Sequence, residues 1–169
     1  TLRDTPNGLR PTQSWHATGS SPDGDIYVAG MDHSTNAALY RLVSRAGKLQ
    51  FVGDARSASE AAHNWMPGET AQKFHTRPLW HRGKVYVGTM DRSTLSDAYL
   101  SRRGFHWYAY DPGLDSFTDL SASESGGSAV PHGNGMAADE RLAACVGDRP
   151  LDGNAPDGVW PVGHDELQA

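Results

Sequence analysis

The sequence predicts an all-β fold that is built from repeated units of four antiparallel strands. The clearest support is an internal repeat, because DIYVAGMD at 25–32 aligns without a gap with KVYVGTMD at 84–91. The 19 glycines and 10 prolines among 169 residues are typical of many short strands joined by turns. A histidine also precedes an aspartate by sixteen residues in three places: His16 and Asp32, His75 and Asp91, and His132 and Asp148. A recurring spacing of this kind indicates a repeat architecture.

The first unit, at about 14–55, contains four expected strands. A short strand at 17–19 leads to the turn PDG, where glycine supplies the dihedral angles of a tight turn. Ile26 and Val28 then alternate with Tyr27, which predicts a strand with two different faces. The runs ALYRLVS and KLQFVGD, joined by the turn RAG, predict the third and fourth strands.

The second unit, at about 73–121, repeats this plan. A strand at 76–80 leads through the turn HRG to a strand in which Val85 and Val87 lie on one face. The runs FHWYAYD and SFTDLS, joined by the turn DPGLD, predict the remaining two strands. Four antiparallel strands in a unit of 57 to 59 residues are the pattern of a β-propeller blade, although common propeller repeats are shorter, at about 40 to 50 residues.

A partial third blade is expected at about 132–169, within a single partial propeller domain that covers 1–169. Propellers usually close with about 4 to 8 blades, so two complete blades and part of a third leave sheet edges exposed. We therefore expect the chain to be a fragment, or to need its remaining blades or another copy of the chain to cover those edges.

The composition excludes several classes of function. No apolar run approaches the ~18 residues of a membrane helix, so no membrane partner is expected. A net charge of -5 does not favour nucleic-acid binding. The single cysteine, Cys145, excludes an internal disulfide framework and any multi-cysteine metal site. Phosphate-loop, dinucleotide, GxSxG and HExxH motifs are absent from the sequence.

Positive charge gathers between 71 and 110, where seven lysine and arginine side chains stand against Asp91 and Asp97. Such a patch could hold an anionic ligand, and a solvated charged face is the equal alternative. The segment also contains a long insertion at 91–105, and loops on a rigid scaffold commonly carry binding residues. The candidates in this insertion are Tyr99, Arg102 and Arg103.

Arranged around a propeller axis, the histidines of the sixteen-residue pairs would converge at one end of the channel. Convergent imidazoles near carboxylates can hold a divalent metal ion, and the candidate ligands are His16, His75 and His132. Alternatively, His and Asp brace each blade through a hydrogen bond, as in WD-type propellers, and a buried polar pair of this kind needs no ligand. The other histidines are interpreted as surface or packing residues in loops and turns, namely His33, His63, His81, His106 and His164.

The combination KFHTRPLWHRGKVYVGTMD followed by HWYAYDPGLDSFTDL resembles propeller proteins related to polysaccharide lyases, notably ulvan lyases and, more distantly, oligogalacturonate lyase. The likeness covers 14 to about 148. It implies cleavage of uronic-acid polysaccharides by β-elimination, with histidine and tyrosine moving protons and arginine or a metal ion neutralising the uronate carboxylate. It also implies an extracellular or periplasmic location. The full catalytic set of those lyases has no match in this chain.

On the lyase hypothesis His75 is the base, because a group that titrates near neutrality suits proton abstraction. Arg77 or Arg102 neutralises the carboxylate and stabilises the developing enediolate charge. Tyr99 or Tyr108 donates a proton to the leaving oxygen. The residues expected to bind the anionic polysaccharide are Lys73, Arg102 and Arg103.

The competing hypothesis is a noncatalytic propeller scaffold that binds protein or glycan, because propellers host functions of both kinds. A channel mouth lined by His75, Arg77 and Arg102, or a bound metal ion, would favour the enzyme. A His and Asp pair within each blade that faces away from solvent would favour the scaffold.

Overall fold

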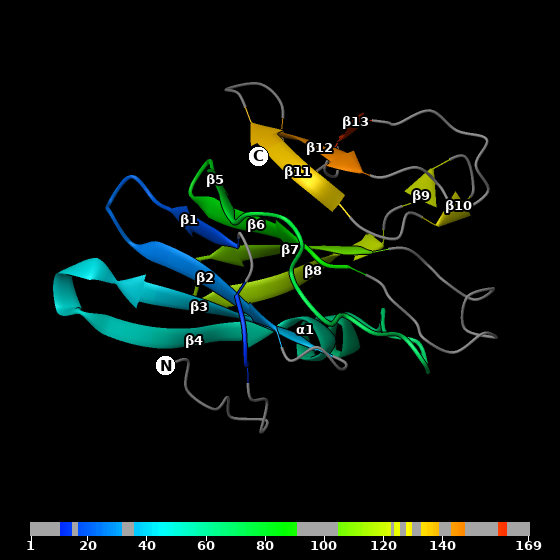
Figure 1. Cartoon of the computed structure of the whole chain (residues 1–169), viewed down its shortest axis with the longest axis horizontal. Helices are drawn as coiled ribbons and strands as arrows, with labels where there is room; N and C mark the ends of the chain where they lie inside the picture. Colours follow the sequence, from blue (N-terminus) through cyan, green and yellow to red (C-terminus); the bar gives the residue numbers. More distant parts are fainter. Residues whose placement is uncertain are drawn as a thin grey trace.

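In the computed structural model, the described part of the 169-residue chain is mostly β, and it contains two four-stranded antiparallel sheets and one short α-helix (Figure 1). It describes residues 11–14, 17–31, 36–90 and 105–122, and the backbone of five further strands between 124 and 161. In the described part of the chain no helix has the length and apolar character needed to cross a membrane.

Sheet 1 is a meander of the four strands expected in the first unit. Its strands are β1 (Thr18–Ser20), β2 (Ile26–Met31), β3 (Ala37–Val43) and β4 (Lys48–Asp54), and each pairs with the next along the chain. The turn after β1 uses Gly24 at a φ of 86°, a left-handed conformation that glycine adopts at no steric cost. The predicted fourth strand, 48–54, coincides with β4.

Sheet 2 repeats the same meander. Its strands are β5 (Leu79–His81), β6 (Lys84–Gly88), β7 (His106–Asp111) and β8 (Ser116–Ala122). The two sheets share an irregularity as well as an order. The pairing of third and fourth strands shifts between Leu39 and Tyr40 in sheet 1 and between Trp107 and Tyr108 in sheet 2. A bulge at equivalent positions in both sheets indicates that the irregularity belongs to the repeated unit.

The strands that follow form a third sheet in the order β11 (Gly133–Ala138), β12 (Ala143–Gly147) and β13 (Val159–Pro161). A small pair, β9 (Glu124–Ser125) and β10 (Ser128–Ala129), precedes it. The first strands of the three sheets are neighbours, because β1 lies beside β5 and β5 lies beside β11 (Figure 1). The sheets therefore follow one another in space in the order of the sequence.

Two short helices were not part of the sequence prediction. The 3₁₀ helix η1 (Ser44–Ala46) fills the hairpin between β3 and β4, and α1 (Ala55–Ala61) follows β4 directly. The carboxylate of Asp54 caps α1 by accepting the Ser57 backbone N–H at 2.9 Å. Ala55 and Ala58 are buried and pack α1 against the sheets. Alanine has the highest helix propensity, which helps so short a helix to form.

The core lies between sheet 1 and sheet 2. The face of sheet 1 that packs there is not the one that corresponds, in the repeat alignment, to the packed face of sheet 2. We call Tyr27, Ala29, Ala37 and Leu39 the contact face of sheet 1, and Val85, Val87, Tyr108 and Tyr110 the contact face of sheet 2; all eight are buried. The rings of Tyr27 and Tyr110 meet edge to face at 6.1 Å. In the repeat alignment Tyr27 matches Tyr86, whose side chain is on the other face of sheet 2. The sheets thus stack front to back.

Close packing between the sheets explains two glycines in their strands. A β-carbon on Gly19 in β1 would collide with the backbone carbonyl of Pro78, just before β5. A β-carbon on Gly53 in β4 would lie 2.6 Å from the ring of Phe117 in β8. The first strands and the last strands of the two sheets therefore approach each other more closely than any larger residue allows.

Candidate functional site

The segment that leads into β5 carries three basic side chains at alternate positions, and all three are more exposed than the residues between them. Phe74, Thr76 and Pro78 are buried, whereas Lys73 and His75 are half-buried and Arg77 is exposed. This alternation means that each odd-numbered side chain is more exposed than the residue that follows it, in a segment that bends at Thr76. We call Lys73, His75 and Arg77 the basic stripe.

Backbone hydrogen bonds hold the basic stripe against β6. The His75 N–H donates to the Gly88 carbonyl at 2.8 Å, and the Gly88 N–H donates to the hydroxyl of Thr76 at 2.7 Å. Phe74 and Thr89 add an isolated antiparallel bridge. The stripe is therefore attached to a rigid sheet, so that a ligand bound there would meet preorganised groups.

Tyr108, a predicted proton donor, lies in the core and is fully buried. Its hydroxyl is 2.8 Å from the hydroxyl of Ser59, and its ring packs edge to face on Phe74 at 5.7 Å. Burial raises the pKa of Tyr108 well above its usual value. Because Phe74 points to the buried side of its segment and His75 to the other, the structure does not bring Tyr108 and His75 together.

The remaining predicted site residues lie outside the described residues. They are the candidate metal ligands His16 and His132 and the insertion residues Tyr99, Arg102 and Arg103. Within the described residues, no group of three or more His, Cys, Asp or Glu side chains is placed to hold a metal ion. Of the predicted site, the structure therefore describes Lys73, His75, Arg77 and Tyr108.

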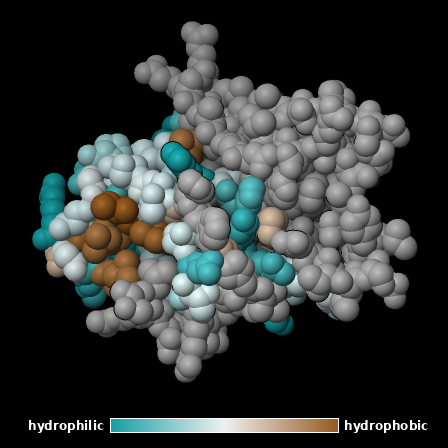
Figure 2. Space-filling view, viewed as in Figure 1, coloured by the Kyte–Doolittle hydropathy of each residue, from teal (hydrophilic) through white to brown (hydrophobic). Residues whose placement is uncertain are grey.

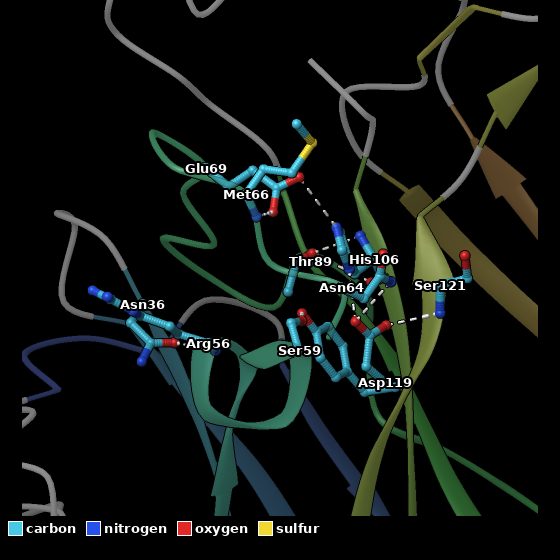
Figure 3. A network of polar contacts seen from close by, with 11 residues as sticks. Asn36, Arg56, Ser59, Asn64, Met66, Glu69, Thr89, His106, Asp119 and Ser121 are labelled. Atoms are coloured by element: carbon cyan, nitrogen blue, oxygen red, sulfur yellow. Dashed lines mark hydrogen bonds and ion pairs between the residues drawn. The ribbon is translucent and has the colours of Figure 1, made fainter. Parts of the chain in front are cut away.

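A second polar group centres on His106, which is the first residue of β7 and is 5% exposed (Figure 3). Its Nδ1 lies 2.9 Å from a carboxylate oxygen of Asp119, in the neighbouring strand β8. Its Nε2 lies 3.8 Å from a carboxylate oxygen of Glu69, in the segment between the two sheets. The side-chain amide of Asn64, in the same segment, donates to Asp119 at 3.0 Å. This His106 cluster fastens the linking segment to sheet 2.

The two carboxylates set the charge of His106. Burial alone would lower its pKa, but the hydrogen bonds and charges of Asp119 and Glu69 outweigh burial and raise the pKa to about 9. Burial would raise the pKa of Asp119, and its pairing with His106 lowers that pKa instead. At neutral pH the cluster is thus a buried imidazolium between carboxylates, a state that does not suit a metal ligand or a general base.

His81 was expected in a turn, and the structure places it in a strand. His106 was expected at the end of a loop and within the predicted strand FHWYAYD, and the structure confirms the strand. His81 ends β5 and is buried, and His106 begins β7. The predicted brace paired histidines with aspartates sixteen residues later, and those aspartates lie outside the described residues. The pair that the structure describes is His106 with Asp119.

A pocket of about 460 Å³ opens elsewhere, where β4, α1 and β8 meet. It shares no residue with the basic stripe or with the His106 cluster. The residues that line it are Phe51, Val52, Gly53, Asp54, Ser57, Ala58, Ala61 and Phe117.

Comparison with known proteins finds no matching family model, no matching curated protein and no matching solved structure. Function is therefore inferred from the fold and the site alone.

Proposed function

We propose that sheet 1 and sheet 2 are consecutive blades of a β-propeller. Three features support this: the same four-stranded meander in both sheets, a bulge at the same place in both, and first strands that are neighbours from sheet to sheet. Front-to-back stacking supports it further, because such stacking continues from one unit to the next in the same sense. The described strands form open sheets rather than a closed barrel.

We propose further that this propeller binds an acidic polysaccharide at the basic stripe and cleaves it by β-elimination. The observation that carries the proposal is the alternation of burial at 73–78, which presents Lys73, His75 and Arg77 together. Three basic side chains at alternate positions of one short segment can make separate contacts to a sugar residue and its carboxylate. The net charge of -5 makes this local positive charge a specific feature rather than a property of the whole surface.

In the proposed reaction the imidazole of His75 removes the proton on the carbon beside the uronate carboxylate. The guanidinium of Arg77 stabilises the negative charge that develops on that carboxylate. The bond from the neighbouring carbon to the glycosidic oxygen then breaks, a carbon–carbon double bond forms, and the leaving oxygen takes a proton. Because Tyr108 is buried, we assign that proton to Tyr99, which lies outside the described residues.

The second candidate function is a noncatalytic scaffold that binds protein or glycan. The His106 cluster favours it, because this histidine and Asp119 are paired within one sheet and face away from solvent. A cluster of this kind stabilises a blade and performs no chemistry.

The test is the effect of His75→Ala on a polyuronate substrate. We expect wild-type protein to generate unsaturated products with new ultraviolet absorbance, and His75→Ala to lose that activity while it still binds the glycan. Arg77→Ala should lose cleavage and should also bind the glycan more weakly, because it removes the charge that contacts the uronate carboxylate. The matched control is His63→Asn, at an exposed residue whose φ of 55° an asparagine tolerates. Glycan binding without cleavage by the wild type would favour the scaffold, and retained cleavage by His75→Ala would remove this residue from the mechanism.

A further inference from the structure

The face of sheet 1 that points away from sheet 2 is apolar across three strands. We call it the open face, and its residues are Ile26, Val28, Tyr40, Leu42, Leu49 and Phe51. Ile26 is 39% exposed and four of the others are half-buried. Tyr40 is buried against Phe51, with ring centroids 5.9 Å apart. Figure 2 shows hydrophobic colour gathered over this part of β2, β3 and β4.

The open face has an equivalent elsewhere in the molecule, and that equivalent is covered. Cross-strand pairing joins Ile26 to Leu42 and Leu42 to Leu49 in sheet 1. At the same places in sheet 2, pairing joins Val85 to Tyr110 and Tyr110 to Phe117. Both rows are wholly apolar.

The next row differs at one position only. Val28, Tyr40 and Phe51 are joined in sheet 1, and the equivalent row of sheet 2 is Val87, Tyr108 and Asp119. The open face is thus at least as apolar as the contact face of sheet 2.

The contact face of sheet 2 shows what such a surface packs against. It is covered by a sheet face of tyrosine, alanine and leucine, in which Tyr27 lies against Tyr110. Val85 and Val87 are 1% and 0% exposed as a result, whereas Ile26 at the equivalent place is 39% exposed. The open face therefore has the composition of a sheet-stacking surface, and among the described residues it is more exposed than its equivalent in sheet 2.

We propose that the open face is the docking surface for a second copy of this chain, which stacks on it through one of its own sheets, front to back. The inference rests on the proposed propeller. Front-to-back contacts are heterologous, so they close into a ring only when the number of units is right. The described residues form three sheets of three or four strands besides the small β9–β10 pair, so two copies supply six, within the range of about 4 to 8 at which propellers close.

The experiment measures the mass of the whole chain by analytical ultracentrifugation over a range of protein concentrations. We expect wild type to sediment at twice 18.2 kDa and Ile26→Lys to sediment as a monomer, because the new charge would be buried in the interface. Leu42→Lys, at the cross-strand neighbour, should do the same. The matched control is Leu114→Lys, which changes an apolar residue that is 78% exposed in the turn before β8 and should leave the dimer intact.

A monomeric wild type at every concentration, an open series of larger species, or an Ile26→Lys protein that remains dimeric would each overturn the proposal. Far-ultraviolet circular dichroism of each variant separates loss of association from loss of folding. Glycan binding is measured in parallel on the same proteins. Ile26 is in sheet 1 and the basic stripe leads into sheet 2. The association experiment and the glycan experiment can therefore fail independently of each other.

Discussion

The buried imidazolium of His106 predicts how the stability of the fold changes with pH. Its pKa is about 9 in the folded chain and 6.5 in the absence of its partners. This difference in pKa corresponds to about 3 kcal/mol of unfolding free energy, at ~1.4 kcal/mol per unit of pKa. Because the folded-state pKa is the higher one, this contribution is fully present below pH ~6.5 and is lost as pH rises through about 9.

The assay is urea unfolding at several pH values between 6 and 10, on wild type and on His106→Gln, whose side chain cannot titrate. We expect wild type to be the more stable protein at pH 6, since the variant leaves the buried Asp119 carboxylate without its cation. The difference between the two proteins should shrink by about 3 kcal/mol by pH 10. His63→Asn, at an exposed histidine, should follow the wild-type curve. A difference that stays constant across this range would refute the charged state assigned to His106.

Two further predictions concern packing at the core. Gly19→Ala should destabilise the fold by about 1–3 kcal/mol, because its β-carbon would collide with the Pro78 carbonyl. The control, Gly113→Ala in an exposed turn, should change the unfolding free energy by less than about 0.5 kcal/mol. Equal urea midpoints for wild type and Gly19→Ala would contradict the close approach of the sheets. Tyr108→Phe should lower the unfolding free energy by about 1 kcal/mol, because it removes the hydrogen bond to the buried Ser59 hydroxyl. The same variant should leave glycan binding unchanged. Loss of binding in a folded Tyr108→Phe protein would show that this tyrosine contacts the ligand.

The strands could be predicted because their signals are local. Alternation at Ile26 to Val28 and a glycine in each turn suffice to define a hairpin, and β4 was predicted residue for residue. The prediction did not include α1, because seven residues are too few for a periodic apolar pattern. The capping Asp54 was a visible signal, but it also ends a run that reads as a strand.

The His106 cluster was not predictable in the same way, because its members come from three separate segments. Glu69 belongs to the segment between the sheets, His106 begins β7 and Asp119 lies in β8. Their proximity depends on the register of β7 and β8 and on the path of the linking segment, neither of which follows from spacing along the chain. The basic stripe could be predicted because its three side chains share one short segment.

The polar residues of the two sheets do different work although the strands repeat. The position of His106 in sheet 2 corresponds to Ala38 in sheet 1, since each stands two residues before the tyrosine that follows the bulge. Sheet 1 instead uses Asp54, which accepts from the Asn36 amide at 2.6 Å and caps α1. A buried carboxylate needs hydrogen-bond partners. Asn36 provides one for Asp54 of sheet 1, and His106 provides one for Asp119 of sheet 2. What repeats is therefore the apolar alternation that stacks one sheet on the other, while the polar residues differ between the two sheets.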